Sequence, residues 1–208
     1  PKNNAKQEHE KAQQQFQISL LLFYQYVEPV WDESTYHFML TTLQTVGNDL
    51  ELTGRMRVAK EGLNCTLSGK PAAVRNFCQG LRDYDPLFMN TDFKLTDGVP
   101  NDKLFKSFSI RKTNELVAYG LAGAAKAPSL KSFEGDHMQA SDYHKDMQEP
   151  NTVNIDVRNA YESALGNFQP PPCGAQLIDP QMRNSIEFPK WLGNPATQKK
   201  LNGKKVLM

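Results

Sequence analysis

The segment Ile155-Asp156-Val157-Arg158-Asn159-Ala160-Tyr161-Glu162 has the pattern of a buried strand that runs directly into a helix. Ligands of parallel α/β sheets bind beyond the carboxyl ends of the strands, so Asp156 and Arg158 are expected at the rim where chemistry takes place. Arg158 and Glu162 are four residues apart and could pair on a helix, which would hold the guanidinium beside an anion-binding loop. An ordinary capped helix with a surface ion pair is the alternative interpretation of this spacing.

Strands and helices alternate on both sides of this segment. In order, we expect a short helix from Ser141, a strand over 152–157, a helix over 159–165, a strand over 175–178, a helix over 186–192 and a strand over 205–208. Strands that alternate with helices in this way are typical of a parallel sheet. The second half of the chain is therefore predicted to be a parallel α/β domain.

The first half of the chain has a different order of elements. We expect strands over 17–27, 55–58, 63–68, 93–96 and 108–111, a helix that Asp32 or Ser34 caps and that ends near Gly47, and a second helix over 71–84. The run 17–27 is apolar and aromatic, which suits a central strand covered on both faces. The order βαββαβ with one extra strand predicts a split βαβ, or ferredoxin-like, α+β domain.

Polar and apolar residues alternate over 55–58 and again over 63–68, on either side of Glu61-Gly62. This period of two predicts a β-hairpin with one face on a core and the other face turned away. Cys65 falls on the apolar face and is expected to be a buried structural thiol. Cys78 lies on the apolar stripe of the second helix and is also expected in the core.

Composition places the chain among ordinary globular proteins. Hydrophobic residues make up 39% and charged residues 23% of the 208 residues, and the net charge of +1 neither indicates nor excludes a polyanionic partner. No apolar run reaches the roughly 18 residues that span a bilayer, so we expect no membrane segment. The three cysteines make no CxxC pair and the four histidines have no ligand-like spacing, so we expect neither a disulfide nor a metal site.

Changes of composition predict how the chain is divided. Residues 1–16 are rich in Lys, Gln and Glu and are expected to be a flexible tail, and 121–127 is expected to be a linker. The ferredoxin-like domain is predicted over 17–120 and the parallel α/β domain over 128–208. The first residue is not Met and the last residues have a strand pattern, so we expect both ends to be cuts from a longer protein.

Four motifs resemble one subfamily of rhodanese proteins. The segment from Asp156 to Glu162 resembles the Asp-x-Arg-x-x-x-Glu element of rhodanese domains. The other motifs are Glu61-Gly62-Leu63-Asn64-Cys65-Thr66-Leu67, Arg111-Lys112 with Leu116-Val117-Ala118-Tyr119-Gly120, and Glu187-Phe188-Pro189-Lys190-Trp191. Together they resemble the tRNA uridine hydroxylases and their eukaryotic, particularly plant, rhodanese-like relatives over roughly 17–208.

This resemblance implies an acylphosphatase-like domain followed by a rhodanese domain that is incomplete at its C-terminus. It implies that the intact protein hydroxylates the wobble uridine of tRNA, with molecular oxygen as co-substrate and no further cofactor. A thiosulfate-type sulfurtransferase that acts through a cysteine persulfide is one alternative, and a non-catalytic RNA-binding or regulatory module is another. An intracellular, cytoplasmic location is expected, with an organelle as the alternative.

The resemblance also implies where the nucleophile lies. The family's catalytic cysteine follows the strand that Lys205–Met208 resembles, within a short Gly-rich loop whose backbone N–H groups lower the pKa of the thiol. None of this chain's cysteines is at that position, so we expect no catalytic residue in the chain and no activity from it alone. Asp156, Arg158 and Glu162 are then expected to support the site.

Two further sets of residues are candidates for contact with substrate. Glu61, Gly62 and Asn64 are implied to face the rhodanese site, although a normal hairpin turn explains them equally well. A basic set on the polar face of the first sheet could neutralise RNA phosphates, and a solvated sheet face is the alternative. That set is Arg55, Arg57, Lys94 and Arg111, with Lys60, Lys112, Lys103 and Lys106 nearby; Lys60 and Lys112 are counted with it as RNA-binding candidates.

Overall fold

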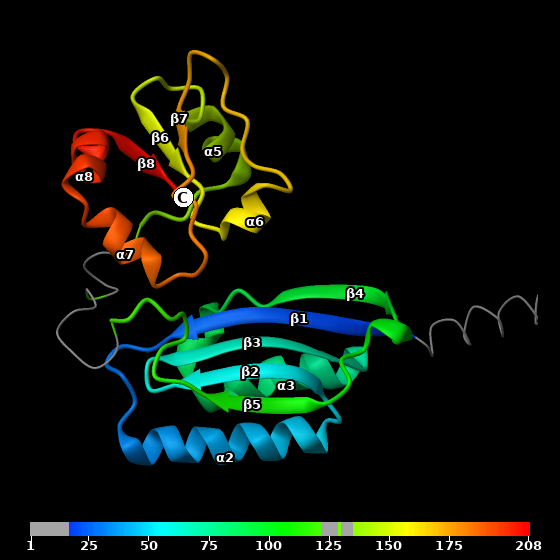
Figure 1. Cartoon of the computed structure of the whole chain (residues 1–208). Helices are drawn as coiled ribbons and strands as arrows, with labels where there is room; N and C mark the ends of the chain where they lie inside the picture. The colour runs from blue at the N-terminus through cyan, green and yellow to red at the C-terminus, as the bar shows by residue number, and fades with distance from the viewer. Residues whose placement is uncertain (1–16, 122–128, 130–134) are drawn as a thin grey trace, which may run out of the picture. The chain divides into compact units, whose positions relative to one another are not determined.

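The computed structural model describes residues 17–121, 129 and 135–208 (Figure 1). Contacts divide the chain into two compact units, with the division between Leu116 and Val117. The tail predicted over 1–16 and all but the first residue of the linker predicted over 121–127 lie outside the described residues. The domain boundaries proposed from composition therefore stay predictions.

The first unit consists of one five-stranded sheet with two helices. Its elements are β1 (Gln17–Tyr26), α2 (Glu33–Asp49), β2 (Thr53–Ala59), β3 (Gly62–Gly69), α3 (Pro71–Tyr84), the 3-10 helix η1 (Pro86–Asn90), β4 (Lys94–Pro100), the 3-10 helix η2 (Asn101–Lys103) and β5 (Phe108–Lys112). The strand order is β4-β1-β3-β2-β5; neighbours are antiparallel except β5, which runs parallel to β2. The predicted split βαβ arrangement with an extra strand is confirmed.

The core of this unit lies between the sheet and its two helices, which pack on one face (Figure 1). Asp32 caps α2 by accepting a hydrogen bond from the Thr35 backbone N–H at 2.7 Å, and Pro71 starts α3. The alternating pattern of the hairpin places Met56 of β2 and Cys65 of β3 in this core with no exposed surface. Cys65 is thus a buried thiol, as predicted.

The prediction that the first strand is covered on both faces is wrong within this unit. Leu21 and Phe23 of β1 are buried in the core, but Leu22 is 49% exposed and Tyr24 is 66% exposed on the opposite face. A continuous apolar run has the same pattern whether its second face is buried or carries exposed aromatic residues, so the sequence did not distinguish the two. The sheet therefore has an open face that includes an aromatic stretch of β1.

The second unit consists of a small parallel sheet and short helices. Its elements are α5 (Ala140–Asp146), β6 (Thr152–Ile155), α6 (Ala160–Ser163), β7 (Gln176–Ile178), α7 (Glu187–Leu192), α8 (Pro195–Leu201) and β8 (Lys205–Leu207). The strand order is β7-β6-β8, and both pairs are parallel. The predicted parallel α/β class is confirmed for this unit.

Helix α8 was not predicted from the sequence, although a signal for it was present. Asn194 accepts a hydrogen bond from the Ala196 backbone N–H at 2.9 Å, and Pro195 occupies the first helical position. An Asn that is followed by Pro is a typical start of a helix. The helix then brings the chain back to β8, which lies beside β6 in the sheet.

Candidate active site

A pocket of about 470 Å³ lies in the second unit, at the carboxyl ends of β6 and β8. Asn154 of β6 is in register with Leu207 of β8, so the residues that follow the two strands emerge at the same edge of the sheet. That edge is where parallel α/β folds bind their ligands. The residues that line the pocket include Asp156, Val157, Arg158, Asn167, Phe168 and Met208. The structure thus brings Asp156 and Arg158 together with the residue that follows β8.

Asp156 and Arg158 form a two-point ion pair at the rim of this pocket. Arg158 Nε donates to Asp156 Oδ1 at 2.9 Å, and Arg158 Nη2 donates to Asp156 Oδ2 at 2.6 Å. The Asp156 side chain is only 2% exposed, whereas that of Arg158 is 44% exposed. The hydrogen bonds from Arg158 hold the pKa of the Asp156 carboxyl below its usual range, so Asp156 is ionised at neutral pH.

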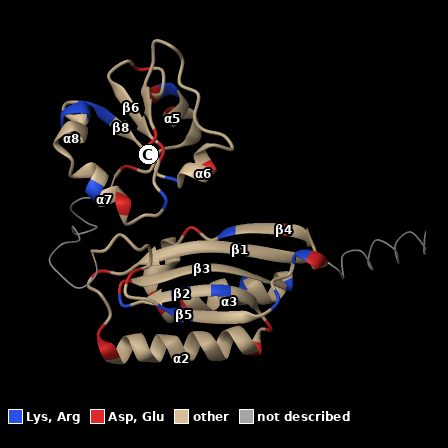
Figure 2. Ribbon diagram, in the orientation of Figure 1, with Lys and Arg blue, Asp and Glu red and all other residues tan. Residues whose placement is uncertain are grey.

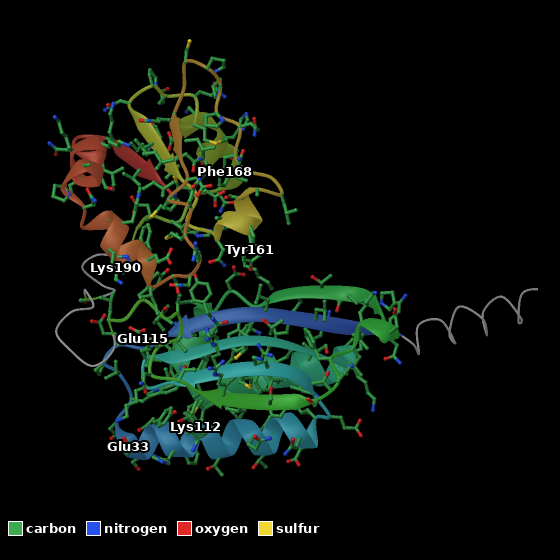
Figure 3. The ribbon with its side chains drawn as sticks, in the orientation of Figure 1. Glu33, Lys112, Glu115, Tyr161, Phe168 and Lys190 are labelled. Atoms are coloured by element: carbon green, nitrogen blue, oxygen red, sulfur yellow. The ribbon has the colours of Figure 1, made fainter. Side chains whose placement is uncertain are left out.

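Arg158 also fixes the loop that forms the far side of the pocket. Its Nη2 donates to the backbone carbonyl of Gly166 at 2.7 Å. Phe168 follows in the same loop, and its ring stacks on Tyr143 of α5 with a centroid distance of 5.3 Å (Phe168 is labelled in Figure 3). The Tyr143 hydroxyl in turn donates to Asn154 Oδ1 at 3.0 Å. The guanidinium and the tyrosine therefore position this loop from two sides.

The predicted pair between Arg158 and Glu162 does not form. Helix α6 begins at Ala160, so Arg158 precedes the helix and the spacing of four residues does not place the two side chains on one helical face. Glu162 Oε2 instead accepts hydrogen bonds from the Asn159 backbone N–H at 3.0 Å and from Asn159 Nδ2 at 2.9 Å. Glu162 thus stabilises the start of α6, as in a capping box, and does not line the pocket.

In the first unit, Glu61 and Arg57 both bind the backbone of Leu116. Glu61 Oε1 accepts a hydrogen bond from the Leu116 backbone N–H at 2.6 Å, and Arg57 Nη1 donates to the Leu116 carbonyl at 3.2 Å. The Glu61 backbone carbonyl accepts from the Val27 N–H at 2.9 Å. These contacts give Glu61 a structural role in this unit. That the Glu61 loop also faces the second domain stays a prediction.

The four basic residues that were predicted on the polar face of the first sheet lie on its open face, and Figure 2 colours the Lys and Arg positions of the strands blue. Arg55 and Arg57 lie in register with Ser109 and Arg111 of β5, and both arginines line a second pocket. Lys94 lies on the same face but at its opposite edge, in register with the exposed Leu22 of β1. Lys60 and Lys112 do not lie on this face. Lys60 pairs with Glu33 at 2.5 Å, Lys94 pairs with Asp92 at 3.4 Å, and Lys112 alternates with Arg111 at the end of β5 (Lys112 and Glu33 are labelled in Figure 3).

The sequence of the first unit matches one known family. Residues 18–116 fit the family model described as the UPF0176 acylphosphatase like domain. Over these residues the first unit is similar to that family's acylphosphatase-like domain, and it is called the UPF0176 domain below. The acylphosphatase-like fold that the motifs implied is therefore confirmed for this part of the chain.

Relatives of the chain extend beyond the UPF0176 domain into the second unit. Over 97% of its length, the chain is 31% identical to Rhodanese-like domain-containing protein 6 of Arabidopsis thaliana, and it covers 35% of that protein. It is 32% identical, over 90% and 92% of its length, to the tRNA uridine(34) hydroxylases of Bacillus cytotoxicus and Bacillus pumilus, of which it covers 52% and 54%. The chain thus spans about half or less of the length of these curated relatives, and the resemblance to their family is confirmed.

Gly62, in the turn of the UPF0176 domain hairpin, is held in a conformation that only glycine adopts easily. Its φ is +133°, and a Cβ there would lie 2.0 Å from the Gln25 carbonyl oxygen. Gly62→Ala should lower the free energy of unfolding by at least about 2 kcal/mol, as measured by urea denaturation. Gly80→Ala is the matched control, because nothing lies within 4 Å of its Cβ position, and it should stabilise α3 by up to about 1 kcal/mol. Equal effects of the two substitutions would contradict this role of Gly62.

The three cysteines are not placed to react in the second-unit pocket. Cys65 and Cys78 are buried in the UPF0176 domain, and Cys173 is exposed in a loop of the second unit. Burial raises the pKa of the Cys65 thiol well above its ordinary value and raises the pKa of Cys78 to about 11. None of the three lines the pocket, so the described residues offer it no activated thiol.

Metal sites and membrane-spanning helices are absent from the described residues. They contain no group of three or more His, Cys, Asp or Glu side chains that could hold a metal ion. No helix in the described part of the chain is long and apolar enough to cross a membrane.

Tyr143 and Phe168, which shape the pocket, were missed from the sequence because single aromatic residues in a short helix and a loop have no distinguishing spacing.

Proposed function

We propose that the intact protein hydroxylates the wobble uridine of tRNA with molecular oxygen, and that the pocket at the ends of β6 and β8 receives the uracil ring. The observation that carries the proposal is that Asp156, Arg158 and Met208 line one pocket. A residue that follows β8 would enter this pocket directly. Relatives named tRNA uridine(34) hydroxylases, which align with both units, support the choice of reaction.

The pocket has the chemistry that such a reaction requires of its surroundings. The exposed part of the Arg158 guanidinium provides positive charge that would stabilise a thiolate from the residues after β8. The Phe168 ring and the exposed Val157 side chain offer apolar surface against which a uracil ring can pack. The Asn167 amide, which also lines the pocket, can donate to and accept from the edge of the base.

The reaction is tested by incubating the full-length protein with unmodified tRNA and measuring hydroxyuridine by mass spectrometry of the digested RNA. Oxygen-dependent formation of hydroxyuridine at the wobble position is the expected result. Thiocyanate formed from thiosulfate and cyanide, without hydroxyuridine, would favour a sulfurtransferase instead. If neither product forms, the remaining candidate function is a non-catalytic RNA-binding module. With tRNA as substrate, we also propose an intracellular, cytoplasmic protein.

The open face of the UPF0176 domain is proposed to hold the tRNA by its phosphates. Arg55 is exposed there and, among the described residues, no acidic side chain pairs with it. Arg55→Glu should weaken tRNA binding about ten-fold at moderate salt, as measured by filter binding, because it replaces a phosphate contact with repulsion. Lys70→Glu is the control, since Lys70 lies outside this face and pairs with Glu51 at 2.5 Å. Equal affinities of the two variants for tRNA would show that this face does not bind tRNA, provided that circular dichroism shows both variants folded.

A further inference from the structure

The open face of the UPF0176 domain is hollowed by a pocket of about 430 Å³. Its floor is formed by β2, β3 and β5, where Arg55, Thr66 and Ser109 stand side by side in register. Its wall is the connection that crosses from β4, at one edge of the sheet, to β5 at the other. Phe105 and Lys106 of this connection line the pocket. The volume falls within the range of roughly 300–1,000 Å³ that is usual for pockets that bind small ligands.

The wall of the pocket is held in place by hydrogen bonds to the sheet. The Phe105 N–H donates to the buried Ser68 hydroxyl at 3.1 Å, and the Gly54 N–H donates to the Ser107 carbonyl at 2.8 Å. Gly54 has a φ of +117°, and a Cβ there would lie 2.3 Å from the Thr66 carbonyl and 3.1 Å from Phe105 Cδ2. The Phe105 ring therefore lies close against a position that admits no side chain. The Phe105 ring is thus held in position before any ligand binds, and Phe105 is still 40% exposed.

The lining of this pocket combines three kinds of groups. Arg55, Arg57 and Lys106 supply positive charge, and no carboxylate lines the pocket. Asn64 and several hydroxyl groups supply short hydrogen-bonding side chains, and Phe105 supplies a ring. Cations alone would suit any anion, but a ring beside them suits an anion that carries a planar group. A nucleotide, with its phosphate, its ribose hydroxyls and its base, matches all three.

The aromatic surface continues from the pocket onto β1. Asn64 of the pocket floor is in register with Tyr24, and Thr66 is in register with Leu22. Tyr24 lies edge to face with Tyr26, with ring centroids 6.2 Å apart. A strand of nucleic acid whose first base reaches Phe105 would therefore find a second aromatic platform beside it. Base faces are available for such stacking only where they are unpaired, since a duplex hides them.

We propose that this pocket binds one unpaired nucleotide of an RNA loop, with its phosphate on Arg55 and Lys106 and its base on Phe105, and that the neighbouring base stacks on Tyr24. The inference rests on the proposed RNA substrate and deepens it. It assigns the UPF0176 domain a preference for single-stranded over double-stranded RNA, which a purely electrostatic sheet face would lack. It also adds Phe105 to the binding residues, and it gives Lys106, named from the sequence as lying near the basic set, a contact with the phosphate.

The test measures the affinity of the chain for a short single-stranded RNA and for a duplex of matched length by fluorescence anisotropy. Phe105→Leu should weaken single-strand binding about ten-fold and leave duplex binding and the salt dependence unchanged. Lys106→Gln should lower the slope of log affinity against log salt by about 0.7, the contribution of one single-strand phosphate contact. Phe105→Tyr, which keeps the ring, should retain the affinity of the unaltered chain.

Controls separate this inference from its alternatives. Phe38→Leu removes an exposed aromatic residue from α2, on the helical side of the sheet, and should have no effect on RNA binding. Unchanged single-strand affinity of Phe105→Leu, with an unchanged melting temperature, would overturn the inference even if Arg55→Glu weakens binding. Binding of free uridine monophosphate as tightly as the strand would also overturn it, in favour of a free-nucleotide site. A failure to detect the proposed hydroxylation would not contradict this inference, because the assay measures RNA binding alone.

Discussion

Arg158→Met should lower the activity of the full-length protein about 100-fold and destabilise the second unit by about 2 kcal/mol. The activity falls because the loop that carries Phe168 loses its anchor at the Gly166 carbonyl, and small displacements of a positioned group have effects of this size. The stability falls because the buried Asp156 carboxylate loses its cation. The stability effect is below the ~3–5 kcal/mol typical of a fully buried pair because Arg158 is partly solvated.

The pH dependence of this destabilisation follows from the pKa of Asp156. In the native protein Arg158 holds that pKa below the ordinary value of 3.8, so the pair stabilises the fold above about pH 4, and this contribution is lost as the pH falls through the lowered pKa. Without the guanidinium, burial raises the pKa of Asp156, and the penalty is greatest at neutral pH. The difference in stability between the two proteins should therefore shrink as the pH falls from 7 to 4.

The second unit can be followed separately because each unit has one tryptophan. In a Trp31→Phe background, the fluorescence of Trp191 reports urea unfolding of the second unit alone. Arg183→Met is the matched control, since Arg183 is an exposed arginine of the same unit that does not line the pocket. Equal stability of the Arg158→Met and Arg183→Met variants at pH 7 would show that the ion pair does not stabilise the unit.

Much of the fold could be predicted because local patterns agree with the tertiary structure. The alternation around Met56 and Cys65 placed the hairpin with the correct face on the core, and Pro71 marked the start of α3. The prediction about β1 was wrong because a pattern of apolar residues records hydrophobicity and not whether a second layer covers it. The sequence could not show that the exposed Tyr24 lies beside Asn64, because this contact depends on the pairing of β1 with β3.

The candidate sites were harder to predict because they depend on contacts between distant segments. Asp156 and Arg158 could be placed at a strand end, but the Gly166 carbonyl that Arg158 also binds lies in a loop without a pattern. The spacing of Arg158 and Glu162 was misleading because the helix begins after Arg158. Phe105 lies in a connection that no periodicity describes, and its position follows from a hydrogen bond to Ser68 of β3, the central strand of the sheet.

The nucleophile of the proposed reaction is expected from the residues that follow β8. A group there would stand beside Asp156 and Arg158, and the loop that the family resemblance implies would lower the pKa of its thiol. The 208-residue chain, none of whose cysteines lines the pocket, should then form no hydroxyuridine and no thiocyanate. Removing an essential nucleophile lowers turnover on the order of a thousand-fold or more.

The most direct test replaces cysteines one at a time in the full-length protein. It then measures the oxygen-dependent formation of hydroxyuridine at the wobble position of tRNA. Changing the first cysteine after β8 to Ser should abolish the product, whereas Cys173→Ser, at an exposed loop position of the same unit, should leave the rate within about two-fold. Both variants should unfold at the same urea concentration as the unaltered protein. Full activity without the cysteine that follows β8, or loss of activity in Cys173→Ser, would contradict the assignment of the reaction to the pocket of β6 and β8.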